Sequence, residues 1–238
     1  MDFKPLRPKV VLGVAAHPDD LDVNAGGTMA YYASQGADVY YLILTNGCNG
    51  TADRTVTAEQ LTRARQEEQR NAAKQLGAKD VFFCAYPDGC LENCPEVRCD
   101  IVKVIRRLKP DVVIAWDPSM FYCAERNIIN HADHRMSGQA TLDAVYPLAR
   151  DHLSFPELLQ HGLEPHKTPA VLLINFNQAN FFVDITPVMD AKLKSIASHT
   201  SQMSDFEEKR AVFIHYAEEL GEACGVQYAE TFVRVDIS

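Results

Sequence analysis

Two short segments of the chain carry side chains that could hold a metal ion and move protons. The first segment, with His17, Asp19 and Asp20, directly follows an apolar run at residues 10–15. Such a run is typical of a buried parallel strand, and open α/β sheets place their chemistry at the carboxyl ends of these strands. His17 and Asp20 are three positions apart, so both can reach one cation, and Asp19 is left to accept a proton. A cluster of this kind is costly to hold unless a metal or a reaction uses it.

The second segment contains His131 and His134, which share a face if they lie on a helix. If His134 joins His17 and Asp20, the three form a two-histidine, one-carboxylate site with open positions. Zinc hydrolases use such a site to hold and acidify a water. Asp19 would then remove the proton of that water, and His131 would be free to stabilise an oxyanion and to protonate a leaving amine. Spacing alone is compatible with a metal site without deciding for it, and it leaves zinc and iron open.

The scaffold that must position these residues is predicted by an alternation of strand-like and helix-like segments. Thr57 and Gln60 form a capping box at the start of one helix, and Gly36 ends another. Strands that alternate with helices imply right-handed crossovers and a mainly parallel sheet, so an α/β fold is expected. The predicted elements are strands at 10–15, 39–44, 81–84, 111–116, 171–174, 181–185 and 231–235, and helices at 28–33, 57–76, 95–108, 130–149, 187–199 and 205–220.

Length, charge and hydropathy limit the classes of protein that the chain can belong to. With 238 residues and no linker of the domain-boundary type, we expect a single domain over residues 1–238. The formal net charge of −9 argues against a nucleic-acid partner, which requires a basic face. No apolar stretch approaches the roughly 20 residues of a membrane span, and no secretory leader is visible, so a cytoplasmic location is expected.

Seven cysteines, an odd number in a chain without an export signal, predict reduced thiols rather than a disulfide framework. Cys90, Cys94 and Cys99 cluster, but their spacing is not that of a zinc site and no fourth ligand is evident. We interpret them as reduced cysteines in a loop and on a helix. Residues 117–130 are expected to be irregular, and the connector at 155–169 is expected to form a lid or an oligomer contact.

The motifs together resemble the LmbE/PIG-L family of zinc-dependent N-deacetylases. The paired segments at 16–20 and 131–134 carry most of this resemblance, which extends from about residue 9 to 202. Further matches are Gly26-Gly27, Thr45-Asn46-Gly47, Arg65 with Glu68, Asp184-Ile185-Thr186 with Lys192, and His199-Thr200-Ser201-Gln202.

The resemblance implies roles for particular residues of this chain. His17, Asp20 and His134 correspond to the metal ligands, which hold Zn²⁺, with Fe²⁺ or Co²⁺ possible in their place. Asp19 corresponds to the general base, and His131, as an imidazolium, to the residue that stabilises the oxyanion and hands a proton to the leaving amine. The implied fold is a Rossmann-like sheet with helices on both faces. The implied reaction is hydrolysis of the acetamide of an N-acetylglucosamine-type conjugate by a homo-oligomer, with trimers or hexamers frequent.

The chain departs from the family pattern at Cys48, where members often have Glu, and at Ala132, where they often have Pro. The first departure puts substrate contacts in doubt, and the second is compatible with a helical turn that keeps the ligands in place. Arg65 and Asp88 fall near strand ends and are candidates for binding polar groups of the substrate. Arg65 could instead pair with a carboxylate of its own helix, and Asp88-Gly89 also suits a turn.

Two other functions fit the same residues. A metal-dependent hydratase or lyase could use the same scaffold on a carboxylated small molecule, because fold and metal do not dictate the reaction. A non-catalytic sugar-binding module is the third hypothesis, and complete rather than degraded motifs argue against it. The intact pair Asp19 and Asp20, together with His131, favours amide hydrolysis.

Overall fold

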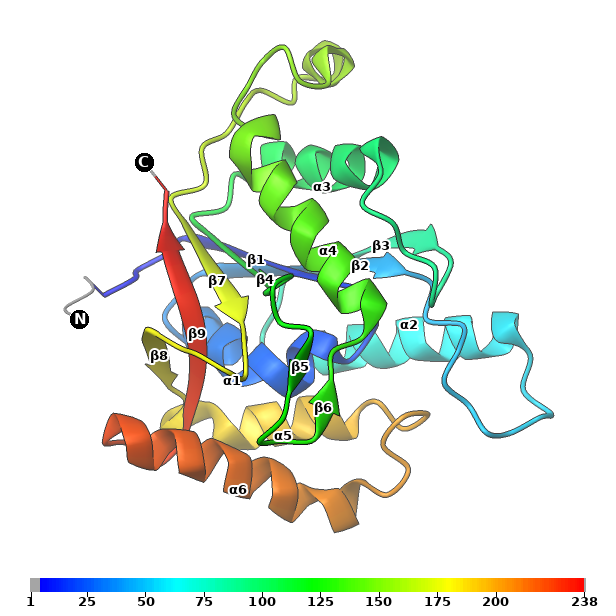
Figure 1. Ribbon diagram of the computed structural model, residues 1–238, viewed down its shortest axis with the longest axis vertical. Coiled ribbons are helices and arrows are strands. Elements are labelled where there is room, and N and C mark those ends of the chain that lie inside the picture. The colour runs from blue at the N-terminus through cyan, green and yellow to red at the C-terminus, as the bar shows by residue number, and fades with distance from the viewer. Residues whose placement is uncertain (1–4, 238) are drawn as a thin grey trace.

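A computed structural model describes residues 5–237, and its central feature is a twisted sheet of seven strands with helices on both faces (Figure 1). Its strands are β1 (Val10–Ala15), β2 (Asp38–Thr45), β3 (Asp80–Tyr86), β4 (Val112–Trp116), β7 (Ala170–Ile174), β8 (Phe181–Asp184) and β9 (Ala229–Asp236). A separate hairpin is made of β5 (Tyr122–Cys123) and β6 (Ile128–Ile129).

An α-helix lies at each of the six predicted helical segments, but the first begins at Asp20, eight positions before its predicted start, and the fourth ends at Asp143, six positions before its predicted end. The α-helices are α1 (Asp20–Ser34), α2 (Ala58–Gln75), α3 (Pro95–Leu108), α4 (Ala132–Asp143), α5 (Met189–Ala197) and α6 (Phe206–Cys224). Three short helical segments are η1 (Ala144–Leu148), η2 (Pro156–His161) and η3 (Thr186–Val188). The predicted capping box is present at α2, where the Thr57 hydroxyl accepts from the backbone N–H of Gln60 and the Gln60 side chain accepts from the backbone N–H of Thr57. No helix within residues 5–237 combines the length and the apolar character needed to cross a lipid bilayer.

The strand order β3-β2-β1-β4-β7-β9-β8 confirms the predicted α/β fold with a mainly parallel sheet. β1 pairs in parallel with β2 and β4, and β7 continues the parallel part next to β4. β9 is antiparallel to both β7 and β8 at one edge. The chain moves outward from β1 in one direction through β2 and β3 and then returns to the other side of β1 for β4. The carboxyl ends of β1 and β4 therefore form the switch point of the strand order, which is where such sheets bind ligands.

The two faces of the sheet are covered by different helices, each packed on its own apolar cluster. One cluster joins the side chains of α1, α2, α5 and α6 to strand residues such as Val11 and Ile114. The other joins α3 and α4 to alternate strand residues such as Leu12 and Val113. Neighbouring residues of one strand face opposite sides, so both faces of β1 and β4 are apolar. This burial explains why these strands are continuous apolar runs in the sequence.

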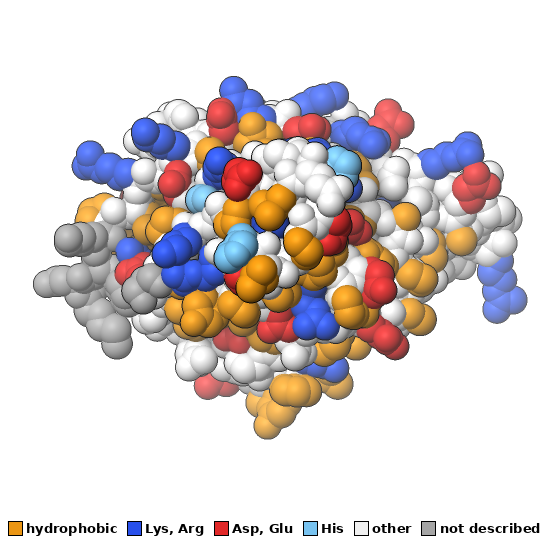
Figure 2. Space-filling view, turned by 90° about the horizontal axis from the view of Figure 1, so that it is seen from above, with side chains coloured by type: hydrophobic (Ala, Val, Ile, Leu, Met, Phe, Trp, Pro, Cys, Tyr) orange, Lys and Arg blue, Asp and Glu red, His pale blue; other side chains and the backbone are white. Residues whose placement is uncertain are grey.

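Two expected irregular segments are more ordered than the sequence indicates. Residues 117–130 contain the β5–β6 hairpin, in which Tyr122 pairs with Ile129. The connector at 155–169 contains the short helix η2, and Arg106 of α3 donates to the carbonyl of Phe155 at its start and to carbonyls of the preceding residues 148–154. Because this connector precedes β7, it lies at the amino edge of the parallel strands, away from the ends of β1 and β4. The prediction that this connector forms a lid over the site is therefore wrong. Its role as an oligomer contact stays a prediction. The surface on this side mixes basic, acidic and apolar side chains (Figure 2).

Candidate metal and catalytic site

The turn between β1 and α1 directs Asp20 back toward the strand end. One carboxylate oxygen, Oδ2, accepts hydrogen bonds from the backbone N–H groups of Ala16 at 3.1 Å and His17 at 2.9 Å. The other, Oδ1, lies 3.0 Å from Nε2 of His134, which comes from the first turn of α4. The strand-end turn therefore fixes the carboxylate, and α4 brings an imidazole to it from more than 100 positions later in the chain.

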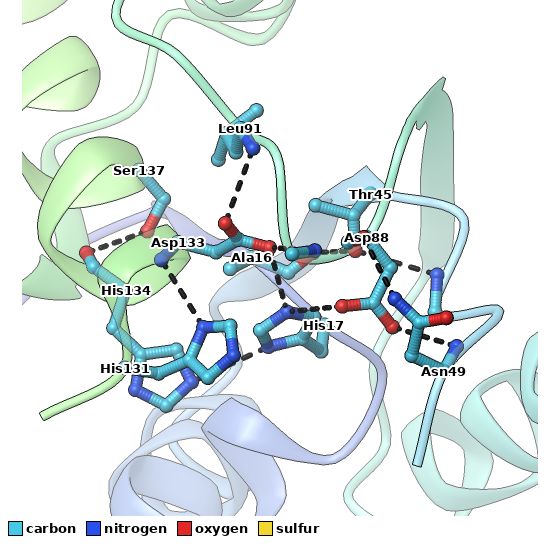
Figure 3. Close-up of polar contacts among 12 residues, drawn as sticks. Ala16, His17, Thr45, Asn49, Asp88, Leu91, His131, Asp133, His134 and Ser137 are labelled. Carbon is cyan, nitrogen blue, oxygen red and sulfur yellow. Dashed lines mark hydrogen bonds and ion pairs between the residues drawn. The ribbon is translucent and has the colours of Figure 1, made fainter.

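His17 lies at the centre of the site, between the other two histidine rings and the Asp88 carboxylate (Figure 3). Its Nδ1 is 3.3 Å from His134 Nε2 and 3.7 Å from the Asp20 carboxylate. Its Nε2 lies 3.1 Å from Asp133 Oδ2 and 3.2 Å from Asp88 Oδ1. Because two carboxylates accept from Nε2, the proton of a neutral His17 belongs on that atom. In this tautomer Nδ1 carries a free electron pair, which is directed at His134 and Asp20.

His134 is held in the complementary tautomer. Its Nδ1 lies 3.0 Å from Asn130 Oδ1, and the Asn130 amide nitrogen donates to the Met120 carbonyl at 2.8 Å. That second bond fixes which end of the Asn130 amide is oxygen, so His134 Nδ1 carries the proton. The indole of Trp116, at the end of β4, stacks on the ring with centroids 4.3 Å apart and fixes its plane. Gly138 lets α4 approach this closely, since a Cβ there would lie 2.2 Å from the Trp116 carbonyl oxygen.

These contacts fit a divalent metal ion. His134 Nε2 lies 3.0 Å from Asp20 Oδ1 and 3.3 Å from His17 Nδ1, and His17 Nδ1 lies 3.7 Å from the other Asp20 oxygen, Oδ2. Donors about 2.05 Å from a tetrahedral Zn²⁺ are separated by about 3.3 Å, which is the middle of this range. Burial lowers the pKa of His17, but the carboxylates of Asp20, Asp133 and Asp88 outweigh burial and raise it to about 12. The pocket thus strongly favours a positive charge at this point.

Two other groups of possible ligands overlap this set within the described residues. His17, His131 and His134 form one group, and His17, Asp88 and Asp133 form the other. In the second group, Asp133 already accepts from the backbone N–H groups of Gly89 and Leu91, and Asp88 accepts from that of Asn49. These carboxylates therefore orient the His17 ring through Nε2, and this leaves Nδ1 available to bind a metal ion. Neither group contains a cysteine, and all seven cysteines are free.

We call His17, Asp20 and His134 the donor set. Asp19 lies beside this set and makes no contact with its side chains. Its carboxylate is 17% exposed and lies 3.4 Å from a guanidinium nitrogen of Arg65. Burial raises the pKa of the Asp19 carboxyl to about 6, while Arg65 opposes this shift and Asp20 adds to it. A carboxyl group with such a pKa is mostly ionised at neutral pH and remains a useful base.

His131 is exposed at the start of α4, with its ring centroid 4.8 Å from that of His17. Its Nδ1 accepts the backbone N–H of Asp133 at 3.1 Å. Burial, with the neighbouring rings of His17 and His134, lowers the pKa of His131. Both observations favour a neutral ring with its proton on Nε2, rather than the imidazolium that the family resemblance implies.

The two predicted substrate contacts are turned toward the protein. Arg65 is 5% exposed and donates to the carbonyls of Pro18 at 2.8 Å and Gly47 at 3.1 Å, so it fastens the loops after β1 and β2 to each other. Asp88 contacts His17 and accepts from the backbone of Asn49. Direct binding of substrate by either residue stays a prediction.

Sequence reasoning assigned no role to Asp133, Asn130 or Gln69. Asp133 is 1% exposed and lies between the two histidines of its motif. Its position inside this histidine pair is the sequence feature from which its role could have been predicted. Asn130 directly precedes that motif. Gln69 has no such signal, because it is an ordinary polar residue on a long polar helix.

Comparison with known proteins agrees with this fold. The profile of the PIG-L family, described as GlcNAc-PI de-N-acetylase, matches residues 12–145, which is more than half of the chain. The chain therefore belongs to the PIG-L family. The match includes both segments that carry the donor set.

Individual relatives match over nearly the whole chain. A diacetylchitobiose deacetylase from Thermococcus kodakarensis is 35% identical over 97% of this chain and 86% of its own length. The crystal structure of an N,N'-diacetylchitobiose deacetylase from Pyrococcus horikoshii superposes with a TM-score of 0.87 and 32% identity, covering 96% of this chain and 84% of that one. The 4-carboxy-2-hydroxymuconate hydratase GalB from Pseudomonas putida shares the fold, with a TM-score of 0.78, 24% identity and 97% coverage of both chains.

Proposed function

We propose that this protein is a metal-dependent hydrolase that removes the acetyl group from an N-acetylglucosamine-type amino sugar. The observation that carries the proposal is the donor set of His17, Asp20 and His134 with Asp19 and His131 beside it. The relatives support the substrate class, because diacetylchitobiose and GlcNAc-PI share an N-acetylglucosamine unit and differ in what is attached to it. The fold alone does not select this reaction, since the hydratase shares it.

The proposed mechanism assigns one task to each group. His17, Asp20 and His134 would hold a divalent ion, which would supply Lewis acidity toward a water and the acetamide carbonyl. Asp19 accepts a proton as the water oxygen attacks the carbonyl carbon. The Nε2–H of His131 donates a hydrogen bond to the oxygen that gains negative charge. Asp19 then returns the proton to the sugar nitrogen as the C–N bond breaks, which releases acetate and a free amine.

Arg65 and Asp88 act in this proposal through other residues. Arg65 sits against the Asp19 carboxylate and the two loops beside it, and Asp88 supports the tautomer of His17. We further propose that the metal is Zn²⁺, with Fe²⁺ or Co²⁺ as alternatives, and that one domain spans residues 1–238. We also propose that the protein is located in the cytoplasm and forms a homo-oligomer.

The test is acetate release from N,N'-diacetylchitobiose and N-acetylglucosamine by the zinc-loaded protein. Asp19→Ala should lower kcat by about 10² to 10⁴-fold, the range for loss of a positioned acid-base group, with one metal still bound per chain. Glu67→Ala, at an exposed position of α2, is the matched control and should keep full activity.

Full activity of Asp19→Ala would contradict its role as the base. Absence of acetate release by the wild-type protein, together with addition of water to an unsaturated dicarboxylic acid, would replace the proposal with the hydratase hypothesis.

A further inference from the structure

The backbone of Asp19 adopts a conformation that few residues other than glycine accept. Its φ of 96° and ψ of −28° lie on the left-handed side, at the junction of β1 and α1. Such a conformation persists only when surrounding contacts determine it, and strained residues of this kind gather at active sites. The contacts that hold this backbone therefore decide where the Asp19 carboxylate points.

Gln69 of α2 supplies the contact to this backbone. Its Oε1 accepts the Asp19 backbone N–H at 3.0 Å, and its Nε2 donates to Asp22 Oδ2 at 2.8 Å. A backbone N–H can only donate and an ionised carboxylate can only accept, so the two partners fix the orientation of the amide. Gln69 is fully buried, so its amide is shielded from bulk solvent.

Asp22 is in turn anchored by two separate parts of the fold. Its Oδ1 accepts from the Tyr41 hydroxyl at 3.0 Å, and its Oδ2 lies 3.0 Å from His199 Nε2. Tyr41 is on β2 and His199 follows α5, and both are completely buried. The amide of Gln69 thus connects the Asp19 backbone to a fully buried, hydrogen-bonded cluster beneath the site.

We propose that Gln69 is a positioning residue for the catalytic base: it holds the left-handed backbone of Asp19 and so directs the carboxylate. The inference rests on the role of Asp19 in the proposed function. Arg65, one helical turn before Gln69, contacts the carboxylate of Asp19 while Gln69 binds its backbone. One face of α2 therefore fixes both parts of the base.

The first experiment measures acetate release by Gln69→Met, which keeps the length of the side chain and removes both hydrogen bonds. We expect kcat to fall by about 10 to 100-fold, the loss that a shift of about 1 Å in a catalytic group can cause. KM should stay within about threefold of the wild-type value and bound zinc should stay at one per chain, because Gln69 contacts neither the substrate nor the metal-binding side chains. Gln75→Met, exposed at the end of the same helix, is the control and should match the wild type.

A double-mutant cycle separates positioning from general structural damage. In an Asp19→Ala background, Gln69→Met should lower the residual rate by less than about twofold, because the group that it positions is already gone. A further loss as large as in the wild-type background, or loss of zinc from Gln69→Met, would overturn the inference.

The second experiment needs no activity. Glycine accepts a left-handed backbone and alanine does so poorly, so Asp19→Gly should have a higher Tm than Asp19→Ala while Gln69 holds that conformation. In the Gln69→Met background the backbone can relax, and the Tm difference should shrink or vanish. An unchanged difference overturns the inference even if the hydrolase is active. A wild-type protein that hydrolyses no acetamide refutes the proposed function and leaves this Tm test valid.

Discussion

Two buried clusters of charged side chains lie close to α1. They differ in whether the protein itself supplies a partner for every charged or polar group in the cluster. Glu230 of β9 accepts from the backbone N–H groups of Gly27 and Thr28 and from the ammonium group of Lys192. Both members of that ion pair are almost fully buried. In the donor set of His17, Asp20 and His134, by contrast, two imidazole nitrogens face each other and a carboxylate.

The difference distinguishes a structural cluster from a binding site. A buried charge needs a partner and hydrogen bonds for its remaining valences. Glu230 finds all of these within the chain, so nothing needs to be added. The donor set has its outer nitrogens satisfied by Asp133 and Asn130, whereas His17 Nδ1, His134 Nε2 and Asp20 Oδ1 face one another and require a cation, a proton or a metal ion, among them. Supporting residues that leave the inner positions open are what a metal site requires.

The largest effect is expected from breaking the internal pair. Lys192→Met leaves Glu230 buried without its counter-ion, which should lower the free energy of unfolding by about 3 to 5 kcal/mol. Urea denaturation with and without zinc would measure this. The rise in stability that zinc causes should remain, because the donor set is untouched. Lys194→Met, exposed on the same helix, should change stability little.

The opposite pattern is expected when the donor set is changed. Asp20→Asn keeps the shape of the side chain and removes its charge, so zinc affinity should fall by more than about 100-fold, the upper range for groups that only support a ligand. Calorimetric titration would give the affinity. The metal-dependent rise in Tm should vanish, although the zinc-free protein stays folded. If Asp20→Asn bound zinc normally, the choice of Asp20 as a ligand would be wrong.

The smallest effect concerns pH. Burial lowers the pKa of His199, but its hydrogen bond to Asp22 and the negative charges around it raise the pKa above its ordinary value of 6.5. A raised pKa means that the folded state holds the proton more tightly, so this stabilisation is complete below about pH 6.5 and is lost as pH rises through the folded value.

His199→Gln retains a donor for Asp22 but cannot titrate. The advantage of the wild type over this variant should therefore shrink with rising pH, by at most about 1.4 kcal/mol per pH unit for one proton. Urea denaturation of both zinc-loaded proteins between pH 5 and 9 would show it. A difference that is constant across this range would contradict the charged form of His199.

Much of the fold could be predicted because local patterns set it. The apolar runs of β1, β2 and β4 and the capped helix α2 lie where the sequence indicates them. The β5–β6 hairpin was not predicted, since two strands of two residues each give no periodic signal. The antiparallel direction of β9 was also not predicted, because neighbours in a sheet are chosen by packing and not by the strand's own residues.

The sequence by itself determined which residues are candidates for the chemistry, since an imidazole and two carboxylates after an apolar strand have few other uses. Only the tertiary structure decided how they are supported. Asp133 orients His17 across 116 positions, Asn130 fixes the proton of His134, and Gln69 joins Asp19 to Asp22 across about 50 positions. A hydrogen bond depends on direction and distance to within tenths of an ångström. Sequence spacing cannot supply these for residues far apart, whereas the packing of α2 and α4 against the sheet does.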